Sequence, residues 1–198
     1  QGGGVYLDYR NNDARLVIEN IKQAVADGAH AVSRVQAVGF LYNDEGKITG
    51  IQAKDLLTDE QFEIHADVVI NTTGPWSDKL RGLDKNDSFT PQMRPTKGVH
   101  LVVDKSRLNV PQPTYFDTGK QDGRMVFVVP REEKTYFGTT DTDYHGDFQH
   151  PTVEQSDVDY LLEVVNNRYP SADIKLDDIE SSWAGLRPLI SSNGGSDY

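Results

Sequence analysis

The sequence contains no cysteine among its 198 residues, which excludes disulfides, zinc–thiolate sites and cysteine nucleophiles. It has no apolar run that approaches the roughly 20 residues needed to cross a bilayer and no signal-peptide pattern, so we expect a cytoplasmic protein. Positive charge is scarce, because 20 Lys and Arg stand against 31 Asp and Glu, for a net charge of −11. Such a surface repels nucleic acids, but one locally positive pocket could still bind a small anion.

The remaining composition, 36% hydrophobic and 26% charged, is typical of a folded protein rather than a disordered one. The chain starts at Gln1 instead of a methionine and stops in the loop-like stretch "SSNGGSDY". We therefore expect a piece of a longer protein, truncated at both ends.

The first part of the sequence predicts an α/β arrangement. Residues 5–9 have a strand pattern, and apolar residues at helical spacing then run from Ala14 to Val25, with Gly28 closing the helix. A β-meander is expected over residues 35–65. The stretch "DVVIN", residues 67–71, lacks alternation, which is typical of a strand buried on both faces of a parallel sheet.

The second part, residues 81–198, predicts a mixed or antiparallel sheet with one helix. The helix is expected over residues 152–169, with Thr152 and Gln155 forming a capping box and Pro170 ending it. Strands are expected at residues 98–103, 114–118, 124–130, 134–140 and 178–190.

The turn "NTTGPW", residues 71–76, has two interpretations. A glycine turn at the carboxyl end of a buried strand lets the backbone approach a cofactor closely. In an ordinary strand-to-helix turn, Pro75 would open a helix and Trp76 would fill the core. Taken alone, the turn favours the ordinary interpretation.

Three further groups of polar residues suggest no site by themselves. The acidic stretch from Asp141 to Asp147 resembles a calcium loop, but Thr152 stands where the bidentate Glu belongs, so we expect no metal site. Arg94 and Lys97 could meet an anion, although solvent-facing charges at a strand edge are the commoner case. His100 alternates with apolar residues and suggests a half-buried structural side chain.

Arg187 is the strongest candidate for binding an anion. Pro188 biases it toward an extended backbone, which would project its side chain from a strand end beside Gly185. A guanidinium suits phosphate or carboxylate. The alternative is a structural ion pair with one of the many acidic residues.

Four stretches in this order, "DARLVIENIKQAVADGA", "VVINTTGPWSD", "KGVHLVV" with "GTTDTDY", and "AGLRPLI", resemble one family over nearly the whole chain. The chain is similar to the FAD-dependent glycerol-3-phosphate dehydrogenases and oxidases, within the D-amino-acid-oxidase-like flavoproteins. This resemblance implies part of a Rossmann-like FAD-binding domain, residues 1–80, interleaved with a substrate domain on a mixed or antiparallel sheet, residues 81–198.

The resemblance also implies roles for individual residues. The backbone of Val35 would face the adenine of FAD, Thr72, Thr73 and Gly74 would lie near the cofactor, and Arg187 would hold the phosphate of glycerol 3-phosphate. The reaction would transfer a hydride from C2 of that substrate to the flavin, and the final electron acceptor, oxygen or a quinone, stays open. Membrane contact would be peripheral at most.

The sequence departs from the family pattern at both ends. The N-terminal glycine fingerprint and the C-terminal segment with a substrate-binding lysine are missing, so no certain catalytic residue can be named. We expect the 198 residues alone to be inactive. The alternative is a non-catalytic α/β binding or interaction module of the same ancestry.

Overall fold

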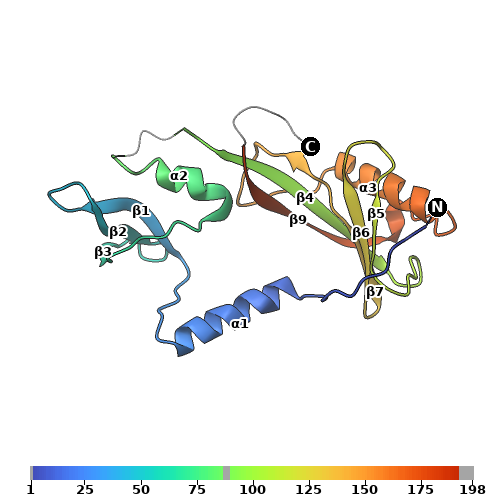
Figure 1. Ribbon diagram of the computed structural model, residues 1–198, viewed down its shortest axis with the longest axis horizontal. Coiled ribbons are helices and arrows are strands. Elements are labelled where there is room, and N and C mark those ends of the chain that lie inside the picture. Colours follow the sequence, from blue (N-terminus) through green and yellow to red (C-terminus); the bar gives the residue numbers. More distant parts are fainter. Residues whose placement is uncertain (1, 87–89, 192–198) are drawn as a thin grey trace. The chain divides into compact units, whose positions relative to one another are not determined.

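The computed structural model describes residues 2–86 and 90–191 (Figure 1). Its internal contacts divide the chain into two compact units, Gln1–Val69 and Ile70–Tyr198. The turn at residues 71–76 therefore packs with the second unit, whereas the sequence-based division placed it with the first. Within the described residues, no helix is long and apolar enough to cross a membrane.

The first unit holds one helix and a three-stranded antiparallel meander, as predicted. Helix α1 is Asp13–Ala26, and the Asn12 side chain caps it by accepting a hydrogen bond from the Arg15 N–H at 3.1 Å. Gly28 follows with a φ of +96°, which glycine adopts without strain. Strands β1 (Val35–Tyr42), β2 (Ile48–Asp55) and β3 (Gln61–His65) pair in that order.

Two predicted strands are absent from the described structure. Residues 5–9 and 67–71 form no strand, and Val68 and Ile70 are 72% and 78% exposed. The prediction of a buried strand at 67–71 is therefore wrong for this chain. A strand buried on both faces is stabilised by pairing with neighbours on both sides, and within residues 2–86 and 90–191 no strand pairs with it.

The second unit is built on a six-stranded sheet in which every pairing is antiparallel. The strands follow the order β5-β6-β7-β4-β8, and β9 also pairs with β4. Their bounds are β4 Met93–Asp104, β5 Thr114–Asp117, β6 Met125–Arg131, β7 Lys134–Gly138, β8 Thr142–Asp143 and β9 Ile179–Ile190. Apart from the two-residue β8, these are the strands that the alternating pattern predicts.

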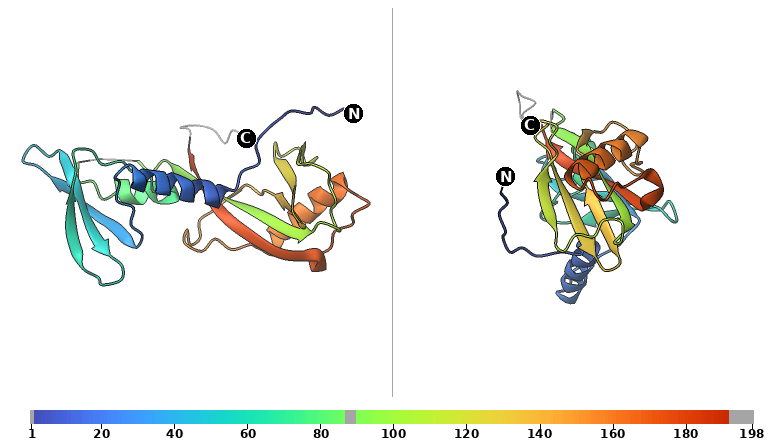
Figure 2. Two further views of the ribbon diagram at one scale, coloured as in Figure 1. Left: turned by 90° about the horizontal axis from the view of Figure 1, so that it is seen from below. Right: turned by 90° about the vertical axis from the view of Figure 1, so that its right-hand side faces the viewer.

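The helices of the second unit are short except for one. They are η1 Gly74–Trp76, α2 Ser77–Arg81, α3 Gln155–Arg168 and η2 Leu176–Asp178. Helix α3 lies along one face of the sheet (Figure 2). The fully buried Val99, Leu101 and Phe137 of the sheet pack there with Leu161 and Val165 of the helix.

Helix α3 begins at Gln155, three residues later than the predicted start at residue 152. Glu154 is the N-cap, and its backbone N–H donates to Asp157 Oδ2 at 3.0 Å. The predicted pair of Thr152 and Gln155 is therefore wrong. The carbonyl of Thr152 instead accepts a hydrogen bond from Lys97 Nζ at 3.1 Å, a long-range contact that local patterns do not reveal.

Candidate functional site

The face of the larger sheet that lies away from α3 carries the predicted anion-binding residue. Along β4, Val99 and Leu101 point into the core, so Gly98 and His100 point to the opposite face. Residues paired directly across two antiparallel strands lie on the same face. The register of β4 with β9 therefore defines what we call the open face: Thr96 beside Arg187, Gly98 beside Gly185, and His100 beside Trp183.

Arg187 reaches from β9 across β4 to the segment that follows β7. Its Nη1 donates to the Thr140 carbonyl at 3.3 Å and to Asp141 Oδ1 at 3.2 Å, and its Nη2 donates to Thr139 Oγ1 at 3.1 Å. These contacts all involve the terminal nitrogens. A guanidinium has five N–H donors, and Nε donates to no partner among the described residues.

The ion pair between Arg187 and Asp141 is the structural alternative that the sequence left open, and it is present. The ion pair does not bury Arg187 completely, because its side chain stays 38% exposed. Asp141 holds the Nη1 end of the guanidinium, while Nε has no hydrogen-bond partner among the described residues. Arg187 is thus tethered, and it keeps N–H donors from which an anion could accept hydrogen bonds.

Two glycines on the open face serve different purposes. A Cβ built on Gly98 would come within 2.8 Å of both terminal nitrogens of Arg187 and within 2.5 Å of Thr139 Oγ1. Gly98 is therefore needed so that the guanidinium can cross the sheet. A Cβ on its partner Gly185 would meet nothing within 4 Å, and Gly185 has no positive φ. The surface beside Arg187 is thus bare and uncrowded.

Aromatic side chains close the other side of the bare surface. The His100 and Trp183 rings stack at a centroid distance of 4.7 Å and 12° between planes, and Tyr136 packs edge-on against His100 at 5.9 Å. Along β4, His100 is two residues from Gly98, which is roughly 7 Å. The sequence analysis treated His100 as structural. Its spacing from Gly98 shows that the two residues share a face, but only the pairing of β4 with β9 places Arg187 on that face.

The local structure of the turn at residues 71–76 matches the ordinary interpretation, in which the turn leads into a helix. Gly74 adopts a φ of +57° and Pro75 opens η1. Asn71 Oδ1 accepts hydrogen bonds from the Thr73 N–H at 3.2 Å and the Thr73 Oγ1 at 2.8 Å. Trp76 is half-buried and packs edge-on against Phe148 at 6.1 Å.

The outer surface of this turn is nevertheless open. Thr72 and Thr73 are exposed, and a Cβ on Gly74 would meet nothing within 4 Å. The turn contacts β4 and β9, the strands that carry the open face. Asp78 strengthens this junction, because its Oδ2 accepts from the Gln92 and Met93 N–H groups at 2.8 and 2.7 Å.

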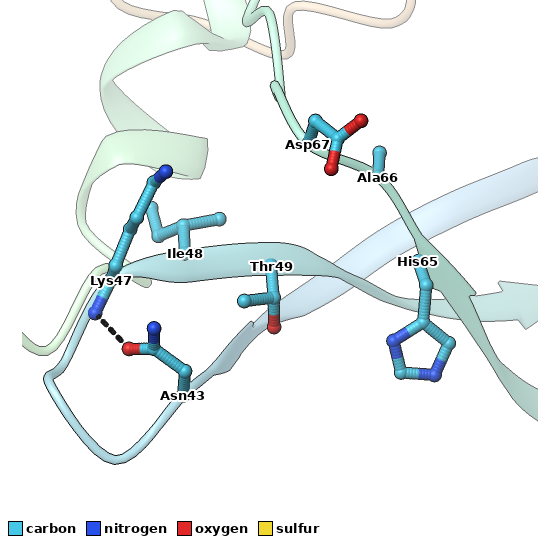
Figure 3. Close-up of a pocket in the computed structure, with 7 residues that line it drawn as sticks. All are labelled: Asn43, Lys47, Ile48, Thr49, His65, Ala66 and Asp67. Atoms are coloured by element: carbon cyan, nitrogen blue, oxygen red, sulfur yellow. Dashed lines mark hydrogen bonds between the residues drawn. The ribbon is translucent and has the colours of Figure 1, made fainter.

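Val35, the fourth residue that the resemblance assigned to the cofactor, lies in the first unit. It is the half-buried first residue of β1 and pairs with Asp55. The same unit contains a hollow of about 430 Å³ at the β1–β2 turn and the end of β3 (Figure 3). The labelled side chains of His65 and Asp67 point in different directions there, so the hollow does not gather a set of reactive groups.

Lys97 does not face solvent, contrary to the commoner case expected from the sequence. It is 3% exposed, and its Nζ lies 2.7 Å from Asp157 Oδ2 and 3.7 Å from Glu154 Oε2. This pair ties β4 to the first turn of α3. Arg94 is more exposed and pairs with Asp143, with Nε at 2.8 Å from Oδ1, and this carboxylate raises the pKa of Arg94.

The carboxylates of the calcium-like stretch bind different cations. Asp141 pairs with Arg187, Asp143 with Arg94, and Asp147 with His150 at 3.0 Å. Hydrogen bonds from the His150 side chain and then the Gln149 N–H lower the pKa of Asp147. Among the described residues, no three His, Asp or Glu side chains are grouped so that they could hold a metal ion.

One buried polar atom on the open face has no partner. Thr96 is 2% exposed, and its Oγ1 forms no hydrogen bond in the part of the chain that the structure describes. Thr96 is paired in register with Arg187. An unsatisfied buried hydroxyl costs about 1–3 kcal/mol, so this position has an unused hydrogen-bonding group beside the candidate anion site.

Known proteins resemble this chain over nearly its whole length. A family model described as FAD dependent oxidoreductase matches residues 1–196. The chain is 74% identical to an alpha-glycerophosphate oxidase of Enterococcus casseliflavus and 69% identical to one of Streptococcus pneumoniae, over its whole length in both cases. It spans about a third of the length of these relatives, 32%.

Solved structures are similar as well. The glycerol-3-phosphate dehydrogenase from Bacillus halodurans, solved in complex with FAD, superposes with a TM-score of 0.88 and 49% sequence identity, covering 96% of this chain and 38% of that one. An L-proline dehydrogenase from P. horikoshii gives a TM-score of 0.61 at 15% identity, covering 87% and 42%. The second likeness concerns the fold alone.

Proposed function

Because the chain belongs to the family of FAD-dependent oxidoreductases, we propose that it forms the central portion of a flavoenzyme that oxidises sn-glycerol 3-phosphate to dihydroxyacetone phosphate. The observation that carries the proposal is Arg187, which is tethered at one end by Asp141, is partly exposed, and lies beside a bare surface. The relatives named as alpha-glycerophosphate oxidases support the same substrate.

The described residues fit contact with part of an FAD molecule. The open surface over Gly74 lets a dinucleotide approach the backbone, and the exposed hydroxyls of Thr72 and Thr73 can donate to its oxygens. Val35 is proposed to meet the adenine end through its backbone. When bound, FAD accepts the hydride that leaves C2 of the substrate.

The chain's own residues bind and orient the substrate. Arg187 offers two parallel hydrogen bonds to a phosphate, which fixes the direction of the carbon chain as well as its position. The hydroxyl proton at C2 must leave as the hydride does, and His100 lies on the same face, two residues from the glycine under the guanidinium. We assign to the His100 imidazole the role of proton acceptor.

Oxygen is the proposed electron acceptor, since the relatives at 74% and 69% identity are named as oxidases. The overall reaction then balances as glycerol 3-phosphate plus O₂ giving dihydroxyacetone phosphate plus hydrogen peroxide. Two electrons and two protons leave the substrate and reduce the oxygen.

Steady-state kinetics of the full-length flavoprotein test the proposal. Wild type should produce hydrogen peroxide from glycerol 3-phosphate and very little from glycerol. Arg187→Lys keeps the charge but loses the planar fork, and should already lower kcat/KM. Arg187→Ala should lower it further, by about 2–4 kcal/mol in total, while the slow turnover of glycerol changes little.

Arg94→Ala is the matched control. Arg94 is also an exposed arginine of the same unit that pairs with an aspartate of the acidic stretch, but it lies beyond Thr96 on β4, paired with Leu189 and farther than Arg187 from the surface over Gly185. Its removal should leave kcat/KM for glycerol 3-phosphate within about two-fold of wild type. An Arg187→Ala enzyme that holds FAD and keeps wild-type kcat/KM would remove Arg187 from the site.

A further inference from the structure

Gly185 is a glycine that neither the backbone nor the packing of the described chain requires. Its φ lies outside the positive range in which glycine is favoured, and a side chain there would meet nothing within 4 Å. It occupies the middle of a strand, where glycine is unfavourable by roughly 0.5–1 kcal/mol relative to alanine. Local structure therefore does not explain the missing side chain.

Its surroundings define the space that the missing side chain leaves. Gly185 lies between Arg187 and Trp183 on the open face, since Ala184 on the alternate position packs toward the core. Its partner Gly98 is covered by the Arg187 guanidinium. The bare strip over Gly185 thus runs from the guanidinium to the stacked rings of His100 and Trp183.

The length of this strip suits a short carbon chain. Two residues along a strand span roughly 7 Å, which is the backbone spacing between Gly98, beneath the guanidinium, and His100. A phosphate bound to the arginine and a hydroxyl two carbons away would lie over this stretch. A methyl group on Gly185 would occupy part of that volume.

We propose that Gly185 determines the size of the substrate, its missing side chain leaving room for the carbon chain of a small hydroxyalkyl phosphate whose phosphate is bound by Arg187. This inference rests on the proposed function and adds to it the residue that limits the substrate. It assigns the two glycines of one register pair to different partners, Gly98 to the arginine and Gly185 to the ligand.

The test compares Gly185→Ala and Gly185→Val in the full-length flavoprotein. Gly185→Ala should lower kcat/KM for glycerol 3-phosphate about ten-fold or more, mainly through KM, and Gly185→Val should lower it further. FAD content should be unchanged, and the melting temperature should not fall, because alanine and valine suit a strand better than glycine.

Inorganic phosphate separates the carbon chain from the anion. It can reach Arg187 without lying over Gly185, so its inhibition constant should change by less than about two-fold in Gly185→Ala. Ser181→Val is the control, because Ser181 lies on the same strand and face beyond Trp183. Its kcat/KM should stay within about two-fold of wild type.

Three results would overturn the proposal. The first is wild-type kcat/KM in both Gly185 variants. The second is a parallel loss of FAD or of melting temperature, which would mean that Gly185 makes room for another segment of the folded protein. The third is an equal change in KM and in phosphate inhibition. If wild type itself does not oxidise glycerol 3-phosphate, the proposed function fails. The role of Gly185 can then still be tested by measuring glycerol 3-phosphate binding to the same variants in a thermal-shift assay.

Discussion

The buried pair of Lys97 and Asp157 should be coupled strongly enough to measure. Their side chains are 4% and 6% exposed, and the charged atoms are 2.7 Å apart. Removing one member of such a pair leaves an uncompensated buried charge and costs about 3–5 kcal/mol. Replacing both members by neutral groups removes that penalty, so the double variant should lose less than the sum of the single variants.

The contacts that each residue keeps after its partner is replaced predict which single substitution loses more folding stability. Without Asp157, Lys97 keeps the carboxylate of Glu154 at 3.7 Å and the carbonyl of Thr152 at 3.1 Å. Without Lys97, the Asp157 carboxylate keeps backbone N–H donors such as that of Glu154 but no cation. Lys97→Met should therefore cost about 3–5 kcal/mol, and Asp157→Asn, which keeps an oxygen for the cap, about 1–3 kcal/mol.

Hydrogen exchange of the α3 amides in the full-length protein is the suitable assay, because large proteins often unfold in more than one step. A loss of 3 kcal/mol corresponds to a fall in protection of about two orders of magnitude. Lys134→Met serves as the control, since Lys134 is 44% exposed and pairs with the exposed Asp104 and Glu180. It should cost less than about 1 kcal/mol.

The reasoning is refuted if the Lys97→Met and Asp157→Asn losses simply add in the double variant, within about 0.5 kcal/mol. Additivity would mean that each residue stabilises α3 through its other contacts. A loss no larger than that of Lys134→Met would equally exclude a strong buried pair.

Two further outcomes are expected. Hydrogen bonds from the Ser106 side chain and N–H, together with one from Lys134, lower the pKa of Asp104 to about 2. The ionised Asp104 therefore stabilises the fold above the unfolded pKa of 3.8, and this stabilisation is lost as the pH falls through about 2. The melting-temperature deficit of Asp104→Asn should shrink as the pH is lowered from 5 toward 2, and a constant deficit would contradict this. His100→Asn should lower kcat for glycerol 3-phosphate by about 10²–10⁴-fold with a smaller change in KM, and the loss should diminish at alkaline pH if the imidazole accepts the proton.

Local patterns predicted much of the fold because local physics decides those elements. Asn12 caps the start of α1, and Gly28 follows its end. The alternation of Val99, Leu101 and Val103 determines which face of β4 packs into the core. Where the sequence analysis failed, a distant partner decides the outcome. The pattern at 67–71 describes a strand only if neighbours pair with it, and nothing near Lys97 in the sequence indicates that it is buried against Asp157.

The candidate site divides in the same way. Arg187 became a candidate through its motif and its neighbouring proline, but its contacts with Thr139 and Asp141 come from residues more than forty positions away. His100 and Gly185 were visible in the sequence, yet only the pairing of β4 with β9 places them on one face with the arginine. The register is a long-range property, which periodicity along a single strand does not contain.

In the proposed substrate site, the shape of Arg187 should matter more than its charge. A phosphate monoester carries nearly two negative charges at neutral pH, whereas Asp141 already offsets much of the charge of Arg187, in a chain of net charge −11. Simple electrostatic attraction between Arg187 and the proposed phosphate substrate should therefore be weak. In the proposed site, what Asp141 provides is orientation, because it holds the Nη1 end of the guanidinium. An ammonium group at this position would keep the charge that Asp141 neutralises and lose the direction, which is why Arg187→Lys is expected to behave as a loss of function.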